Sequence, residues 1–323
     1  MNILITAPFD SQCANLLAKD HRVIVSPQVP AEAQLCEAEI NRYLLDEDID
    51  ILICESAVIG RRALEGVERL KLLCVCRAGL NKIDRDAVAE KGIVVTNTPG
   101  RNAAAVAELV IYYMIGLRRH FYIGTEKIRS GEWTDSTDLY SELQGFELNG
   151  AFIGFLGFGA VPREVAKRLA AFNVTMFAYD PFVDCKTAQK YQVTLKDAEY
   201  IFENCDFVSD HLPDIELLKG FVDSEKLELM KPGAFFINTG RAGTTDEHAL
   251  AEAIKAGRIA GAAIDVFSRE PLPADHPYLN IENIMLTPHL GGASKNVVSN
   301  HSRMVLEDIR VFLNGEDPQR RVR

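Results

Sequence analysis

The stretch that decides the fold, residues 151–182, reads AFIGFLGFGAVPREVAKRLAAFNVTMFAYDPF. An apolar run leads into Gly157, Phe158 and Gly159, and apolar side chains then recur every three or four residues, the spacing of an amphipathic helix. A second apolar run follows and ends at Asp180. The pattern predicts a strand, a helix and a parallel strand, with two glycines in the turn that precedes the helix.

This turn has the features of a dinucleotide site. Gly157 allows a tight turn, and Gly159 lets the main chain approach a pyrophosphate. The amides of Ala160 and Val161 and the positive end of the helix dipole are available to the phosphates. Asp180 can accept hydrogen bonds from both ribose hydroxyls, and its charge would repel a 2′-phosphate. The sequence therefore predicts NAD as the cofactor in preference to NADP.

Pro162 stands where such loops usually have a third glycine. Proline is tolerated in the first turn of a helix, because the N–H that it lacks would have no helical partner there. We therefore expect the helix to persist, shifted slightly off the strand. The alternative interpretation is a Rossmann-like turn that binds nothing.

The same alternation of apolar runs and helical patterns extends along the chain, and the 323-residue length fits two domains. The runs are nearly continuous, as expected of parallel strands covered by helices on both faces. The expected fold class is therefore α/β, with two doubly wound, Rossmann-like parallel-sheet domains. Strand-length runs occupy residues 2–8, 21–27, 50–56, 70–76 and 92–99, and then 151–157, 174–181, 205–213, 233–240, 259–267 and 283–290.

Composition excludes several classes of partner. The net charge is −11 and no basic run is present, which argues against nucleic-acid binding. No apolar stretch reaches membrane-spanning length, and the N-terminus is typical of a first strand rather than a signal peptide. Seven cysteines with scattered spacing indicate a reducing, cytoplasmic compartment. Cys74 and Cys76 are interpreted as core residues, so no metal site is expected.

Residues 102–117 form an almost wholly apolar helical stretch. A helix that is apolar on all sides must be buried, and we expect this one to lie between domains or against another subunit. The more polar residues 127–149, which include Trp133, are interpreted as a connector.

Three successive apolar runs end in chemically useful side chains. The run at 233–240 leads to Arg241, the next leads to Glu270, and the last leads to His289. Parallel α/β sheets bind ligands beyond the carboxyl ends of their strands. Arginine offers a planar fork for a carboxylate, histidine exchanges a proton near neutral pH, and a glutamate can orient the imidazole. Each residue alone has an ordinary structural explanation, but together they predict an acid–base site that binds a carboxylate.

The chain resembles the D-isomer-specific 2-hydroxyacid dehydrogenase family along essentially its whole length. The long series from GAFFINTGR through AAIDVFSREPL to TPHLGG is more specific than the glycine turn. The stretches that carry the resemblance are CRAGLNKID (76–84), GIVVTNTPGRNAAAVAEL (92–109) and residues 146–172, 229–272 and 283–294.

By this resemblance, Arg241 binds the substrate carboxylate and polarises the 2-oxo group, His289 is the acid–base, and Glu270 holds and tunes it. Hydride passes between the nicotinamide and C2 of a D-2-hydroxy acid or 2-oxo acid. The resemblance also implies substrate contacts from Arg77, Ala78 and Gly79, and cofactor contacts from Pro213, Thr239, Gly240 and Asp265.

The resemblance implies a discontinuous outer domain. Residues 1–98 and 290–323 form a flavodoxin-like substrate-binding domain, and residues 99–289 form the NAD-binding Rossmann domain. The cleft between them is expected to close on the substrate and exclude water. The family is typically dimeric through its nucleotide domains, so a homodimer is expected.

Two departures from the family pattern concern the substrate. The loop CRAGLNKID is shorter than the usual version, and Glu55 stands where phosphoglycerate-oxidising members typically have an arginine. A carboxylate there would repel a phosphate. From the 323-residue length we also expect no regulatory module of the kind that many such members carry. A small, unphosphorylated substrate is therefore expected.

Three alternatives stay open. The first is an NADH-sensing binding protein similar to the corepressors related to this family, although the intact Arg241, Glu270 and His289 favour catalysis. The second is a phosphoglycerate dehydrogenase. The third is a formate- or phosphite-oxidising enzyme, which would not need a proton donor to a carbonyl.

Overall fold

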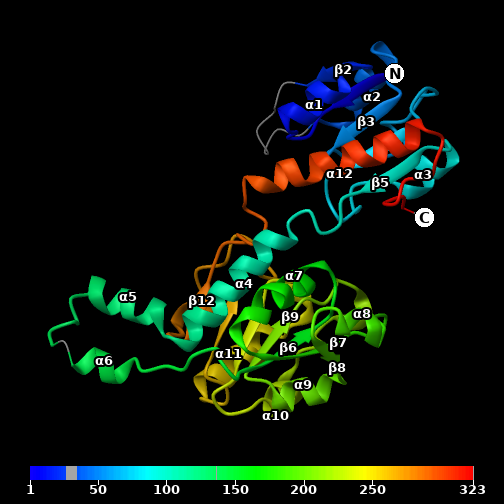
Figure 1. Cartoon of the computed structure of the whole chain (residues 1–323). Coiled ribbons are helices and arrows are strands. Elements are labelled where there is room, and N and C mark those ends of the chain that lie inside the picture. Colours follow the sequence, from blue (N-terminus) through cyan, green and yellow to red (C-terminus); the bar gives the residue numbers. More distant parts are fainter. Residues whose placement is uncertain (27–34, 136, 323) are drawn as a thin grey trace. The chain divides into compact units, whose positions relative to one another are not determined.

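The computed structural model describes residues 1–26, 35–135 and 137–322. The chain forms two compact units, one of residues 1–101 and 294–323 and the other of residues 102–293 (Figure 1). The boundaries lie a few residues beyond those expected after 98 and 289. Helix α4 (Ala103–Arg118) starts the second unit, and the loop after His289 stays with it because Asp265 binds the amides of Leu290 and Gly291.

The first unit has a five-stranded parallel sheet in the order β2-β1-β3-β4-β5. The helices α2 and α3 pack on one face, and α1 and α12 pack on the other, so each face has its own apolar core. The elements are β1 (Asn2–Ile5), α1 (Ser11–Leu17), β2 (Arg22–Val25), α2 (Glu37–Asp46), β3 (Ile51–Cys54), β4 (Leu72–Val75), α3 (Arg85–Glu90), β5 (Val94–Asn97) and α12 (Asn296–Leu313).

The interpretation of Cys74 and Cys76 as core residues is confirmed, since both are fully buried. Burial raises the pKa of Cys54 and of Cys74 to about 12, and that of Cys76 well above its ordinary value. These thiols are therefore protonated and unreactive.

The second unit has a seven-stranded parallel sheet in the order β12-β11-β10-β9-β6-β7-β8. The strand order reverses between β6 and β9, which makes the fold doubly wound and confirms the expected class. The strands are β6 (Phe152–Leu156), β7 (Thr175–Tyr179), β8 (Val193–Leu195), β9 (Phe207–Asp210), β10 (Phe235–Asn238), β11 (Gly261–Ile264) and β12 (Ile284–Leu286).

Helices cover both faces of this sheet. One apolar core lies under α4 and α7, and the other lies under α9, α10 and α11. The helices after α4 are α5 (Phe121–Arg129), α6 (Asp138–Glu142), α7 (Ala160–Leu169), α8 (Cys185–Gln189), α9 (Ala198–Asn204), α10 (Ser224–Leu229) and α11 (Glu247–Lys255).

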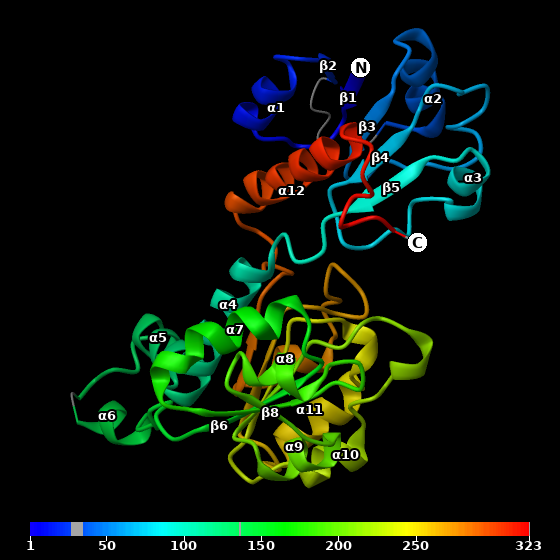
Figure 2. The same ribbon diagram turned by 45° about the vertical axis from the view of Figure 1, so that its right-hand side comes forward.

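The apolar helix α4 is buried largely by its own unit. Val110 and Tyr113 are fully buried in the core that α4 shares with α7 and the sheet. Tyr112, on another side of the helix, is half exposed. Burial was expected, but most of it comes from the sheet of the same unit. The next helices, α5 and α6, lie away from the sheet (Figure 2).

In the described part of the chain, no helix combines the length and the apolar character that crossing a membrane requires.

Candidate active site

The glycine turn lies between β6 and α7. Gly157 has a φ of +83°, which strains any residue with a side chain, and a Cβ added to it would lie only 3.0 Å from the carbonyl oxygen of His211. A Cβ added to Gly159 would meet no atom within 4 Å. The first glycine is thus needed for the turn, and the second leaves an open surface at the helix start.

Helix α7 begins at Ala160, which confirms that Pro162 does not abolish it. Its N-cap residue is Gly159, which has no side chain to bind the amides of the first turn. The buried Pro162 occupies that turn and lacks an N–H. The amides of Ala160 and Val161 and the helix dipole therefore suit an anion.

Asp180 follows β7 and is fixed against the glycine turn. One carboxylate oxygen accepts the amide of Phe158 at 2.8 Å, and the other accepts the amide of Phe182 at 2.9 Å. Each oxygen has a further lone pair that can accept a hydroxyl proton. The position and orientation suit the ribose of a dinucleotide.

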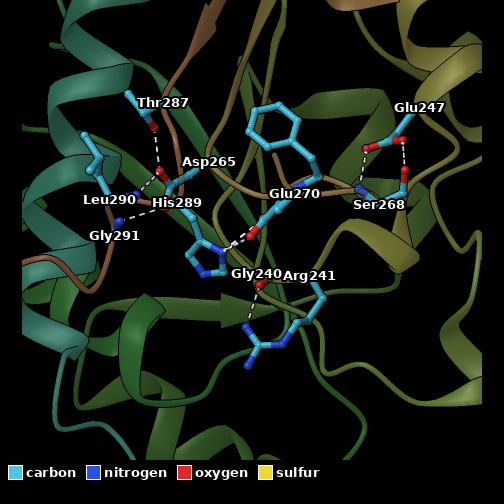
Figure 3. A network of polar contacts seen from close by, with 11 residues as sticks. Gly240, Arg241, Glu247, Asp265, Ser268, Glu270, Thr287, His289, Leu290 and Gly291 are labelled. Carbon is cyan, nitrogen blue, oxygen red and sulfur yellow. Dashed lines mark hydrogen bonds and ion pairs between the residues drawn. The ribbon is translucent and has the colours of Figure 1, made fainter. Parts of the chain in front are cut away.

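The central feature of the site is the pair formed by His289 and Glu270 (Figure 3). The Nδ1 atom of His289 lies 3.0 and 2.9 Å from the two carboxylate oxygens of Glu270. Burial opposes ionisation of Glu270, but hydrogen bonds from His289 and from the Phe267 amide outweigh it and lower the pKa of Glu270. An ionised carboxylate only accepts, so Nδ1 carries the proton and Nε2 remains to exchange one with a ligand.

The loop that carries His289 is anchored by Asp265. The carboxylate oxygens of this buried residue accept the amides of Leu290 and Gly291, both at 2.7 Å, and the hydroxyl of Thr287 at 2.5 Å. A Cβ added to Gly291 would lie 2.9 Å from Asp265, so this approach requires glycine. The anchoring holds His289 in a left-handed conformation with a φ of +53°, which is costly for a residue with a side chain.

Glu270 is held by its own loop and by α11. The amide of Phe267 donates to Glu270 at 3.1 Å. Both the amide and the hydroxyl of Ser268 donate to Glu247 of α11, at 3.0 and 2.5 Å. The carboxylate that faces His289 is thus positioned by two neighbouring elements.

Arg241 follows β10 and faces the same pair. Its positive charge contributes to the lowered pKa of Glu270, and its Nη1 donates to the carbonyl of Gly240 at 2.8 Å. Figure 3 shows its guanidinium group beside the imidazole of His289 and the carboxylate of Glu270. Because β10, β11 and β12 are adjacent, the loops that follow them bring these three side chains together at one edge of the sheet.

Thr239 has a property that suits a ligand. Its Oγ1 is buried without a hydrogen-bond partner among the described residues. A buried hydroxyl without a partner is unfavourable, so a bound group that supplies one is stabilised. Together with the open turn at Gly159, this fits a nicotinamide dinucleotide along the carboxyl ends of the strands.

Residues 111–291 match the family model described as "D-isomer specific 2-hydroxyacid dehydrogenase, NAD binding domain". The match covers more than half of the chain. The chain belongs to this dehydrogenase family. The expected recognition is thereby confirmed, and so is NAD as the cofactor of the second unit.

Relatives extend the similarity over both units. A D-3-phosphoglycerate dehydrogenase of Methanocaldococcus jannaschii is 32% identical over 318 residues, which cover 98% of this chain and 58% of the relative. A hydroxypyruvate reductase of Thermotoga maritima is 33% identical over 294 residues, covering 90% of this chain and 91% of the relative. The chain spans a little over half the length of the phosphoglycerate dehydrogenases that it matches.

A solved structure supports the fold of this family member. The NAD-complexed D-isomer specific 2-hydroxyacid dehydrogenase of Lactobacillus delbrueckii ssp. bulgaricus has a TM-score of 0.84 at 21% identity and covers 100% of both chains. At this identity the likeness concerns the fold alone.

The remaining residues that the resemblance implies for the site stay predictions. Pro213 is exposed in the segment after β9, and Arg77, Ala78 and Gly79 follow β4 in the first unit, where the Ala78 carbonyl accepts the side chain of Asn97 at 2.7 Å. The cofactor contact that the resemblance implies for Asp265 also stays a prediction, and its contacts in the structure are with the His289 loop.

Glu55 has a partner that the sequence did not reveal. Its carboxylate pairs with Arg101 at 2.6 Å, and the second guanidinium nitrogen of Arg101 lies 2.8 Å from Nδ1 of the buried His301. Arginine only donates, so Nδ1 of His301 accepts, and Nε2–H donates to the carbonyl of Pro8 at 2.8 Å. Glu55 is therefore charge-paired, and its repulsion of a phosphate is weaker than expected.

Proposed function

We propose that this chain is an NAD-dependent D-2-hydroxyacid dehydrogenase, of class EC 1.1.1.-, acting on a small and unphosphorylated acid. The observation that carries the proposal is the His289–Glu270 pair, which leaves Nε2 of His289 free, beside Arg241. An acid–base imidazole next to a carboxylate-binding guanidinium is what 2-oxo acid reduction needs.

In the reduction of a 2-oxo acid, Arg241, His289 and Glu270 have different roles. Arg241 binds the substrate carboxylate and polarises the 2-oxo group. Protonated His289 donates its Nε2 proton to the oxygen at C2, and Glu270 stabilises the imidazolium before that transfer. Bound NADH would supply the hydride for C2, which gives the 2-hydroxy acid and NAD. In the oxidative direction Nε2 accepts the hydroxyl proton.

A panel of 2-oxo acids tests the proposal. We expect NADH oxidation with pyruvate, glyoxylate or hydroxypyruvate. Turnover with NADPH should be slower, because the carboxylate of Asp180, held at the glycine turn, would repel a 2′-phosphate. Steady-state kcat/KM is the measured quantity. Higher kcat/KM with phosphohydroxypyruvate would favour a phosphoglycerate dehydrogenase. NADH binding without turnover of any acid would favour the sensor interpretation.

We infer that the enzyme is a homodimer. The segment from α5 to β6 exposes large apolar side chains, a feature of interfaces. The half to three-quarters exposed residues are Phe121, Ile128, Trp133, Tyr140 and Phe146. A second copy of the chain is the occupant that the family resemblance favours.

Light scattering after size-exclusion chromatography is expected to give twice the 35.8 kDa chain mass. The double variant Trp133→Glu and Phe146→Glu is expected to give the mass of one chain, because two charges would enter an apolar interface. Leu279→Glu, at a half-exposed position elsewhere in the unit, is the matched control. A double variant that retains the dimer mass would contradict this assignment.

The compartment is inferred from the thiols. All seven cysteines are free, and five are buried. This supports a reducing environment such as the cytoplasm.

A further inference from the structure

A buried polar cluster lies directly beneath the main chain of Arg241. Asp210 ends β9 and is fully buried, and Asn238, its register partner, ends β10. Thr244 and Thr245, in the loop after Arg241, complete the cluster and are also buried. A buried carboxyl group without a cationic partner is costly unless it is neutral or its oxygens are hydrogen-bonded.

Two short contacts meet at the hydroxyl of Thr244. Its Oγ1 lies 2.6 Å from Oδ2 of Asp210 and 2.6 Å from the main-chain carbonyl oxygen of Arg241. Asn238 also donates to the Arg241 carbonyl, at 3.1 Å. The other carboxyl oxygen of Asp210 accepts the amide of Leu212 at 2.9 Å.

Counting protons at Thr244 fixes the state of Asp210. A threonine hydroxyl has one proton, whereas a carboxylate and a carbonyl both only accept. With Asp210 ionised, one of the two 2.6 Å contacts would join two oxygens without a proton between them. With Asp210 protonated, its O–H donates to Thr244, and Thr244 donates to the carbonyl of Arg241.

We propose that Asp210 is a positioning residue for Arg241, acting as a neutral acid at the start of a proton chain that runs through Thr244 to the Arg241 carbonyl. This inference rests on the proposed function, because it concerns the grip of Arg241 on a substrate carboxylate. Two side-chain donors, Asn238 and Thr244, then hold the Arg241 carbonyl together with the more distant amide of Thr244.

The environment of Asp210 agrees with this state. Burial raises the pKa of Asp210 to about 6, although the hydrogen bonds that it accepts act in the opposite direction. Burial also lowers the pKa of the adjacent His211 to about 3, so this imidazole is neutral and bonds with the hydroxyl of Ser209 at 2.9 Å. The strand end therefore supplies no positive charge that would ionise Asp210.

The charged groups of the neighbouring loop have other partners. Arg241 directs Nη1 to the carbonyl of Gly240. The carboxylate of Asp246 caps α11 by accepting the amides of His248 and Ala249, both at 3.0 Å. The carboxylate of Asp214 lies near Gly243 of the same loop.

Loss of the Asp210 proton changes the contacts of Arg241. The Thr244 hydroxyl proton turns to the carboxylate, which is the stronger acceptor, and the Arg241 carbonyl keeps Asn238 and the longer contact of 3.4 Å from the Thr244 amide. The position of the guanidinium is then less well defined. The KM for the 2-oxo acid is therefore expected to rise as the pH increases through about 6.

The test compares KM for the 2-oxo acid between pH 5 and 8.5 in wild type and variants. In Asp210→Asn the side-chain amide can donate to Thr244 while its oxygen accepts from the amide of Leu212. We therefore expect a low KM without the pH-dependent inflection, and a kcat within about twofold of wild type.

Thr244→Val should raise KM severalfold at every pH, and Thr244→Ser should restore the wild-type KM. The informative quantity is the difference in KM between each variant and wild type at the same pH, because it removes pH effects that all the proteins share.

Asp206→Asn is the matched control. Asp206 precedes the other end of β9 and pairs with Lys231 at 3.1 Å. This variant should keep the wild-type inflection. An inflection that persists unchanged in Asp210→Asn overturns the proposal.

Two readouts do not depend on turnover. A carbon-13 NMR titration of Asp-labelled protein, assigned with Asp210→Asn, should place the Asp210 carboxyl transition near pH 6. A folded pKa above the unfolded one means that stability is lost as pH rises through the folded value, so Asp210→Asn should stabilise the protein at pH 8 more than at pH 5 in urea unfolding. Inactivity towards all 2-oxo acids with these results intact would refute the proposed function only; an Asp210 transition below pH 4.5 would refute the proton chain.

Discussion

Replacement of His289 with glutamine is expected to lower kcat for 2-oxo acid reduction by about 10²- to 10⁴-fold, the usual contribution of a positioned general acid. The side-chain amide of glutamine can donate a hydrogen bond to the carboxylate of Glu270, but it cannot deliver a proton to the oxygen at C2. Steady-state NADH oxidation at saturating substrate measures the effect. NADH binding should be nearly unchanged, because the substituted group acts on the substrate.

His248→Gln provides the matched control, since His248 is exposed at the start of α11 and takes no part in the His289 network. This variant should retain wild-type kcat. If His289→Gln kept kcat within tenfold of wild type, another group would have to be the proton donor.

Replacement of Arg241 with glutamine is expected to raise the KM for the 2-oxo acid by about 10²- to 10³-fold. A guanidinium that pairs with a carboxylate in a desolvated site contributes about 2–5 kcal/mol to binding, and each 1.4 kcal/mol is a factor of ten. Arg241→Lys should recover part of this, because lysine retains the charge but not the planar fork. The full dependence of rate on substrate concentration measures both parameters.

The fold should tolerate the change, because the Arg241 side chain is exposed. Arg269→Gln, next to Glu270 in the sequence and also exposed, controls for the loss of one positive charge near the site. An unchanged KM in Arg241→Gln would remove Arg241 from the substrate site, whereas an equal rise in both variants would indicate a long-range charge effect.

Much of the fold follows from continuous apolar runs. Each of the eleven runs identified in the sequence contains a strand, because parallel strands buried on both faces need apolar side chains at every position. Strand β8 was not predicted by any run. Its three residues, Val193–Leu195, pair with β7 at the edge of the sheet. An edge strand this short has no run long enough to distinguish it from a loop.

The convergence of Arg241, Glu270 and His289 was also predictable, since sequential strands that are neighbours must end at the same edge. The partners of other polar residues were not. Arg101 and His301 are 200 positions apart, so nothing local indicates that they meet. The neutral state of Asp210 likewise depends on Asn238 and Thr244, which reach it only through sheet pairing.

The connectivity of the first unit has a consequence for biosynthesis. Helix α12 supplies Val305 and Ile309 to the apolar core on one face of the N-terminal sheet, and Thr96 bridges to Arg321. A ribosome releases these segments only after the whole nucleotide-binding unit has emerged. Ile3 and Leu72, which α12 helps to cover, therefore lack these contacts while the middle of the chain is synthesised. The nascent chain is at its greatest risk of misassociation at that stage, and this is where a chaperone that shields apolar sheet faces would be of most use.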